Sequence, residues 1–185
     1  NLDCIRSDFE TPVRKIIDRF IRNGIDDIGM IAGKELTVTE KQGVRDPRVA
    51  TFNQYLKSKG LYNDKFVYQG PFGPESGFNL MTKAINELGE ALPNGFMVGS
   101  DSMAVGVLRA LQQHHIDVPN RVSLISFNDV AIAKYTSPAL TTVHVHTELM
   151  GERAIEMLLE RVKNPKKIPE LIIIGTELME RESSI

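Results

Sequence analysis

The sequence predicts an α/β fold in which a parallel sheet carries helices on both faces. Short apolar strands alternate with amphipathic helical segments, and successive strands recur about every 30 residues, which is the spacing of βαβ units. The composition, with 42% hydrophobic and 25% charged residues, is that of a folded soluble domain and excludes collagen-like, coiled-coil and disordered chains. Right-handed crossovers between parallel strands then place helices on both faces.

The first half of the chain contains two helix–strand alternations. Helices are expected from Thr11 to Gly24 and from Asp46 to Gly60, because each begins with a polar cap followed by proline and ends at glycine. Strands 28–32 and 66–68 lie between and after them. The apolar residues of the first helix recur at helical spacing: Val13, Ile16, Ile17, Phe20 and Ile21.

The second half repeats this alternation and then changes. A helix over 78–88 leads to strand 96–98, and a helix capped by Ser100 or Asp101 leads to strand 122–127. After Pro138 the pattern is less regular. The segments expected there are an extended stretch over 140–145, a helix over 149–162 and a strand over 171–174. The late strand could complete this sheet or cross to a second lobe.

Charge and cysteine content exclude several classes of protein. The 22 Lys and Arg residues against 24 Asp and Glu residues give a net charge of −2, so no polyanion-binding surface is indicated. The single cysteine, Cys4, cannot form an internal disulfide, which fits a reducing compartment. No apolar run approaches the ~18 residues of a membrane span, and the start is not a signal peptide. The chain does not begin with methionine, so a fragment of a longer protein is expected.

Ligands of open parallel sheets bind beyond the carboxyl ends of the strands. In this chain those ends are Gly33-Lys34, the turn 70–73, Ser100-Asp101 and Asn128-Asp129. The predicted crevice therefore contains small polar groups, two carboxylates and one aromatic ring, Phe72.

Arg48, near the start of a helix, can point into the same space. Arginine and asparagine can bind adjacent hydroxyls, and an aromatic face can cover the apolar side of a sugar ring, so the set suits a polyhydroxylated ligand.

Structural roles explain some of these residues equally well. Asp101 can act as a helix cap, and Asn128-Asp129 can form a turn without any contact to a ligand. An arginine at a helix start is usually solvated. The convergence of the residues at strand ends favours a site more than any one of them does.

Enzymatic and metal-binding motifs are absent from the sequence. No Gly-x-Ser-x-Gly elbow, Walker loop or Gly-x-Gly-x-x-Gly occurs, so we expect no catalytic residue, no cofactor and no enzyme activity. His144 and His146 project to one side of a strand, but no third ligand is placed by spacing, so no metal site is expected. Lys166-Lys167 is interpreted as a loop and not as a nucleic-acid-binding patch.

Residues 100–111, Ser-Asp-Ser-Met-Ala-Val-Gly-Val-Leu-Arg-Ala-Leu, resemble the Asn-Asp-x-Met-Ala-x-Gly-x-x-Arg-Ala-Leu signature of the LacI/GalR family of transcriptional repressors. Four further blocks match the family in order and spacing. They are 118–129, 137–143, 148–153 and 177–183. The resemblance covers almost the whole chain.

The resemblance implies a type I periplasmic-binding-protein-like effector domain without its helix-turn-helix and without most of its N-terminal subdomain. Residues 1–26 would be a remnant of the N-terminal subdomain, and 27–145 would be the C-terminal effector-binding subdomain. Residues 146–170 would carry a helix crossing back to the N-terminal subdomain, and 171–185 a closing strand and tail.

The resemblance also implies the effector contacts. Arg48 matches the arginine that grips effector hydroxyls, and Phe72 matches the aromatic that stacks on the effector. Ser100 stands where many members have Asn, and Asn128 where many have a sugar-binding Asp. Asp101 is expected to be structural, and so is the Asp that follows Asn128.

The function implied is sugar sensing by a cytoplasmic repressor of carbohydrate utilisation, with galactose or a galactoside as effector. It would form a homodimer, would not contact a membrane, and would bind operator DNA only through the absent domain. The effector would act by shifting the population between arrangements of two lobes. The alternative is a periplasmic-type sugar-binding protein of a transport system, and a small α/β enzyme is the third interpretation.

Overall fold

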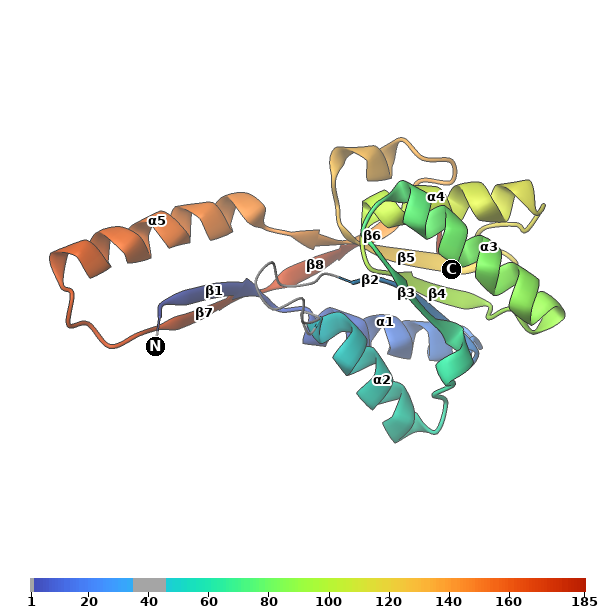
Figure 1. The fold of residues 1–185 in the computed structure, drawn as a ribbon, viewed down its shortest axis with the longest axis horizontal. Coiled ribbons are helices and arrows are strands. Elements are labelled where there is room, and N and C mark those ends of the chain that lie inside the picture. Colours follow the sequence, from blue (N-terminus) through green and yellow to red (C-terminus); the bar gives the residue numbers. More distant parts are fainter. Residues whose placement is uncertain (1, 35–45) are drawn as a thin grey trace.

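The computed structural model describes residues 2–34 and 46–185, which form two lobes of unequal size (Figure 1). The larger lobe contains a six-stranded sheet with the order β3-β2-β4-β5-β6-β8, and all its neighbouring strands are parallel except β6 and β8. Its strands are β2 (Ile28–Gly33), β3 (Val67–Gly70), β4 (Gly95–Val98), β5 (Ser123–Asn128), β6 (Thr141–Val145) and β8 (Thr176–Met179). The predicted α/β class with a mostly parallel sheet is confirmed.

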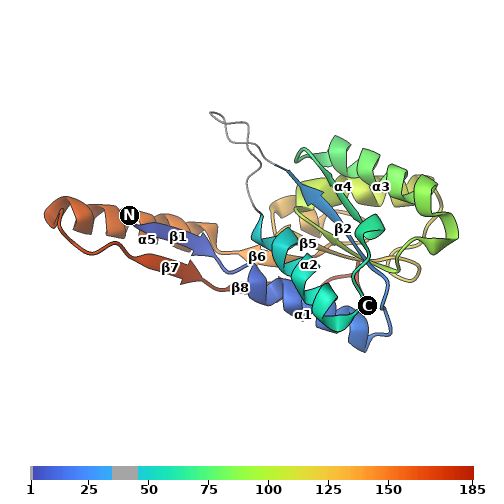
Figure 2. The same ribbon diagram turned by 60° about the horizontal axis from the view of Figure 1, so that its bottom comes forward.

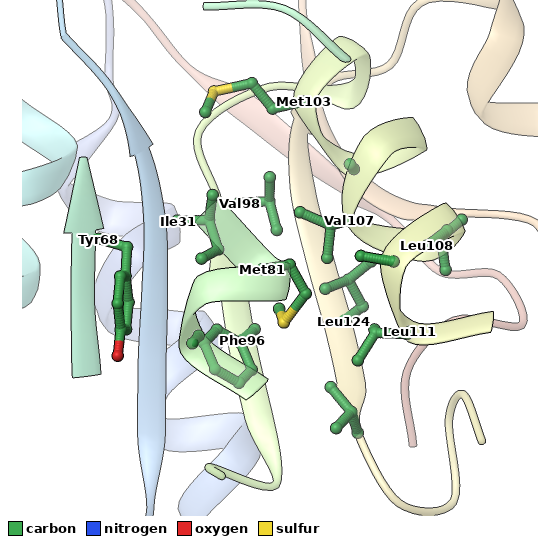
Figure 3. Close-up of a cluster of buried hydrophobic side chains, with 14 of the residues drawn as sticks. Ile31, Tyr68, Met81, Phe96, Val98, Met103, Val107, Leu108, Leu111 and Leu124 are labelled. Atoms are coloured by element: carbon green, nitrogen blue, oxygen red, sulfur yellow. The ribbon is translucent and has the colours of Figure 1, made fainter. Parts of the chain in front are cut away.

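Helices cover both faces of this sheet. Alternate residues of each strand point to opposite faces, so Met30 and Ala32 of β2 pack against α1 and α2, and Ile31 packs against α3 and α4. Figure 3 shows the second of these two cores, in which Phe96 and Leu124 lie beneath Met81 and Leu111. The helices are α1 (Glu10–Arg22), α2 (Pro47–Lys59), α3 (Pro74–Leu88) and α4 (Asp101–Gln113). Short 3-10 turns are η1 (Asp64–Phe66), η2 (Gly89–Ala91) and η3 (Ala131–Lys134).

The first helix corrects two predictions. Residues 1–26 were expected to be a remnant of the other subdomain, but α1 packs against the larger sheet, with its apolar face fully enclosed in that core. Thr11 was expected to cap this helix. The side chain of Asp8 instead accepts hydrogen bonds from the backbone N–H groups of Glu10 and Thr11, both at 3.0 Å.

The smaller lobe consists of β1 (Cys4–Ser7), β7 (Leu171–Ile174) and α5 (Thr147–Lys163), which extend away from the larger sheet in both views (Figures 1 and 2). β1 and β7 form a parallel two-stranded sheet. Much of the apolar face of α5 is exposed, including Ile155 and Leu158, which are 61% and 62% exposed. None of the helices within residues 2–34 and 46–185 is both long and apolar enough to cross a membrane.

The chain passes between the two lobes at three places, after β1, after β6 and after β7. The late strand therefore crosses to the smaller lobe as β7, and β8 then returns to close the larger sheet beside β6. Only His146 separates the end of β6 from the start of α5, so this connection between the lobes is short.

Candidate functional site

The register of the sheet brings the predicted strand ends together. Gly33 of β2 pairs with Gly70 of β3, and the backbone N–H of Gly99, just after β4, donates to Ile31 of β2 at 2.8 Å. β5 lies beside β4 and runs parallel to it, so Asn128, the last residue of β5, lies at the same edge of the sheet. Arg48 and Phe72, together with the segments that carry Ser100 and Asn128, thus converge on one edge.

Arg48 lies in the first turn of α2 and is nearly enclosed, with a side chain that is 12% exposed. Its Nη1 donates to the backbone carbonyl of Gly99 at 2.5 Å, which joins α2 to the residue before Ser100. Its Nε and Nη2 donate to the carboxylate of Asp46. The guanidinium is therefore held in a fixed orientation at the end of β4.

Three aromatic rings surround this guanidinium. Its Cζ lies 5.8 Å from the ring centroid of Phe72, 5.6 Å from that of Phe127 and 4.9 Å from that of Phe9. Such distances allow cation–π attraction and keep the local dielectric low. Phe127 directly precedes Asn128. Arg48 therefore contacts the segments that carry Phe72, Ser100 and Asn128.

Phe72 rests on Gly33. A β-carbon built on Gly33 would lie 2.1 Å from the ring of Phe72, so only glycine leaves room for the ring in this position. Phe72 as a whole remains 38% exposed. Phe72 therefore presents an apolar face at the strand ends, as a stacking residue requires.

Ser100 and Asn128 differ in how they are held. The Oγ of Ser100 accepts a hydrogen bond from the backbone N–H of Met103 at 3.3 Å, so Ser100, and not Asp101, caps α4. Asn128 has a φ of 108° and the following Asp129 a φ of 55°. Asparagine and aspartate tolerate positive φ better than most residues, at a cost on the order of 1 kcal/mol or more.

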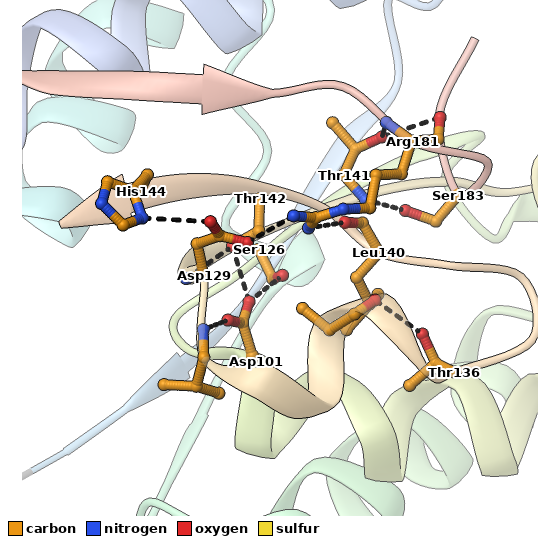
Figure 4. A network of polar contacts seen from close by, with 12 residues as sticks. Asp101, Ser126, Asp129, Thr136, Leu140, Thr141, Thr142, His144, Arg181 and Ser183 are labelled. Atoms are coloured by element: carbon orange, nitrogen blue, oxygen red, sulfur yellow. Dashed lines mark hydrogen bonds and ion pairs between the residues drawn. The ribbon is translucent and has the colours of Figure 1, made fainter.

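A buried polar network supports this strained turn (Figure 4). The fully buried carboxylate of Asp101 accepts hydrogen bonds from the hydroxyls of Ser126 and Thr142 and from the backbone N–H of Val130, the last at 2.8 Å. Burial, as the largest cause, raises the pKa of the Asp101 carboxyl above its ordinary value, although the hydrogen bonds oppose it. Asp101 thus ties α4 to β5 and β6.

Asp129 joins the same region to the end of the chain. Its carboxylate accepts a hydrogen bond from Nη2 of Arg181 at 2.6 Å and lies 3.0 Å from Nδ1 of His144 (Figure 4). With 7% of its side chain exposed, Asp129 has one carboxylate oxygen in an ion pair with Arg181 and the other within hydrogen-bond distance of His144. The structural role expected for Asp129 stays a prediction.

His144 of β6 and His146, which lies between β6 and α5, have their rings edge to face with centroids 4.7 Å apart. His146 approaches Glu177 of β8 at 3.8 Å. Among residues 2–34 and 46–185, no group of three or more His, Cys, Asp or Glu side chains could hold a metal ion.

Sequence reasoning missed two residues that contact Arg48. Asp46 was assigned only as a helix cap, and its side chain does accept from the backbone N–H of Arg48 at 2.8 Å, but it also pairs with the guanidinium. Phe9 carried no signal, because it precedes α1 by one residue and reaches Arg48 only through the tertiary fold.

Comparison with known proteins gives a consistent family assignment. The sequence model of a periplasmic binding protein-like domain matches residues 17–184. The transcriptional regulator GalR of Lacticaseibacillus casei is 45% identical over 99% of this chain and 55% of its own length. GalR of Streptococcus thermophilus is 38% identical over 98% of this chain and 54% of its own length.

A solved structure of the transcriptional regulator CelR in complex with cellobiose has a similar fold. It superimposes with a TM-score of 0.87 and 26% identity, covering 99% of this chain and 54% of that one. The chain therefore spans about half the length of these regulators.

Proposed function

Because the chain belongs to the LacI/GalR family of transcriptional regulators, through its periplasmic-binding-protein-like domain, we propose that it is the sugar-sensing part of a repressor of carbohydrate utilisation. The effector is galactose or a galactoside. The family assignment favours this function over the alternative of a transport protein. The relatives compared above are transcriptional regulators, and we propose that this chain likewise catalyses no reaction.

One observation carries the proposal: Arg48 contacts Phe72 and the residues next to Ser100 and Asn128 at a single edge of the sheet. Arg48 donates to sugar hydroxyls, Phe72 stacks on the apolar face of the ring, and the amide of Asn128 both donates and accepts. The oxygen of Ser100 accepts from the backbone N–H of Met103, and its hydroxyl proton donates to the effector. The buried carboxylates provide support and do not contact the sugar.

The mechanism is a shift in population between two arrangements of the lobes. The effector binds one arrangement more tightly, and the three passages between the lobes carry the change to DNA-binding domains outside this chain. Residues 27–145, joined by α1, form the C-terminal effector-binding subdomain. Residues 146–170, with β1 and β7, belong to the N-terminal subdomain. We further propose a cytoplasmic homodimer.

Replacement of Arg48 tests this function. In the full-length gene product, Arg48→Ala should weaken galactose binding by about 100-fold, because hydrogen bonds to a charged group contribute on the order of 1.5–3 kcal/mol. Operator binding without effector should remain. Titration calorimetry with galactose, lactose and cellobiose, followed by operator release on labelled DNA, measures both properties.

Arg109→Ala is the control variant, because it removes the same positive charge from an exposed position on α4. It should leave the sugar dissociation constant unchanged. An Arg48→Ala protein with the wild-type dose response would remove Arg48 from the site. A wild-type protein that binds sugar but no DNA would instead favour the transport alternative.

A further inference from the structure

Helix capping explains only part of the contact between Asp46 and Arg48. A cap needs one side-chain oxygen, and Oδ1 of Asp46 supplies it to the backbone N–H of Arg48 at 2.8 Å. The carboxylate also receives Nε of Arg48 on Oδ1 at 3.0 Å and Nη2 on Oδ2 at 2.8 Å. Asparagine caps helices as well as aspartate does, so capping alone does not account for this forked ion pair.

The pair has little contact with water. The side chains of Arg48 and Asp46 are 12% and 14% exposed, and the rings of Phe9, Phe72 and Phe127 lie around the guanidinium. In such surroundings a lone cation would be costly, and it would attract any anion that entered the site. Because Asp46 carries the opposite charge, the pair of Asp46 and Arg48 has no net charge.

The pair also decides which donors of Arg48 remain free for a ligand. A guanidinium has five N–H donors. Among the residues that the structure describes, Asp46 takes the Nε donor and one on Nη2, and the carbonyl of Gly99 takes one on Nη1. One donor on Nη1 and one on Nη2 remain, in a plane fixed from two sides, and this is the arrangement that adjacent hydroxyls of a sugar can accept.

We propose that Asp46 is a positioning and specificity-determining residue, which orients Arg48 and cancels its charge so that the site selects uncharged sugars over sugar phosphates. The proposal rests on the proposed sugar-sensing function. A phosphate group carries roughly two negative charges near neutral pH. Beside Arg48 a phosphate would lose its hydration and would be repelled by the carboxylate of Asp46. A sugar hydroxyl is uncharged and needs only the free donors on Nη1 and Nη2 of Arg48.

Among residues 2–34 and 46–185, the other charges at this edge do not replace Arg48 as an anion site. Asp129 is itself an anion and is paired with Arg181 and His144, while the carboxyl of Asp101 is buried. Lys34, at the end of β2, is exposed, so its charge is screened by water. The balance between Asp46 and Arg48 is therefore expected to dominate the choice of ligand charge.

The test is Asp46→Asn in the full-length gene product, with galactose and galactose 6-phosphate as probes in titration calorimetry. Asparagine keeps the helix cap but leaves the positive charge of Arg48 without the compensating carboxylate. Wild type should bind galactose and bind the phosphate at least tenfold more weakly. In Asp46→Asn we expect galactose affinity to fall about tenfold and phosphate affinity to rise about tenfold, since one hydrogen bond to a charged group is worth about a factor of ten or more.

Asp18→Asn is the matched control, because Asp18 pairs with Lys59 at the other end of α2 and its loss removes the same charge. It should leave both dissociation constants at the wild-type values. Equal binding of the two probes by wild type, or an Asp46→Asn protein with the wild-type ratio, would overturn the role of Asp46. If the wild-type protein bound neither these probes nor lactose or cellobiose, the sugar-sensing function itself would fail, and with it this inference.

Discussion

Gly106→Ala should destabilise the chain by about 3 kcal/mol, because overpacking costs typically 1–3 kcal/mol and here the obstacle is backbone. A β-carbon on Gly106 of α4 would lie 1.8 Å from the carbonyl oxygen of Pro74 and 2.6 Å from the backbone nitrogen of Phe78, both on α3. No side chain can turn away to make room. Urea unfolding followed by circular dichroism measures the change.

The helix α3 also has a glycine at this contact with α4. A β-carbon on Gly77 of α3 would lie 2.1 Å from the carbonyl oxygen of Met103 on α4. The two helices thus approach so closely that each needs a glycine where it meets the other. Separating them would open the core around Met81 and Val107, which are fully buried.

Gly151→Ala on α5 is the matched control. It is also a glycine within a helix, but a β-carbon there would meet no atom within 4 Å. Alanine should therefore be neutral or should stabilise α5 by up to about 1 kcal/mol through helix propensity alone. Equal effects at both positions would show that propensity, and not helix contact, governs Gly106.

The strand ends could be predicted because parallel-sheet geometry fixes which ends meet. Once strands 28–32, 66–68, 96–98 and 122–127 were recognised, Phe72, Ser100 and Asn128 followed as neighbours. The structure brings their segments together around Arg48, as that geometry predicts.

Other features depend on tertiary contacts that no local pattern records. The apolar spacing of α1 indicates a buried face but not which sheet covers it, so its placement in the smaller lobe was wrong. The ion pair between Asp46 and Arg48 is a local contact, but it depends on the backbone angles at the start of α2, and the sequence indicated only a cap. The contact of Phe9 with Phe127, at 6.0 Å between centroids, joins residues far apart in the chain.

Asp101→Ala should reduce the free energy of unfolding by on the order of 3 kcal/mol, since three donors lose their acceptor and each unpaired buried group costs about 1 kcal/mol or more. Those donors are the hydroxyls of Ser126 and Thr142 and the backbone N–H of Val130. Asp117→Ala is the control, because Asp117 is exposed and its side chain accepts, among the described residues, from Asn120 only, while the bonds to its backbone carbonyl are kept in alanine. It should change stability by less than about 0.5 kcal/mol in the same urea experiment.

Asp101→Asn tests how the titration of this carboxyl affects stability. Because burial raises the pKa of Asp101 above its ordinary value of 3.8, the native state binds its proton more tightly than the unfolded state does. The part of the stability that comes from this tighter proton binding is therefore complete below pH 3.8 and is lost as the pH rises through the raised native pKa. Asparagine does not titrate, so the stability difference between wild type and Asp101→Asn should be largest in acid and should shrink towards neutral pH. Urea unfolding of both proteins from pH 4 upwards, at intervals of about one unit, measures this difference. A difference that grows with pH would mean that the three donors hold the carboxylate ionised against the effect of burial.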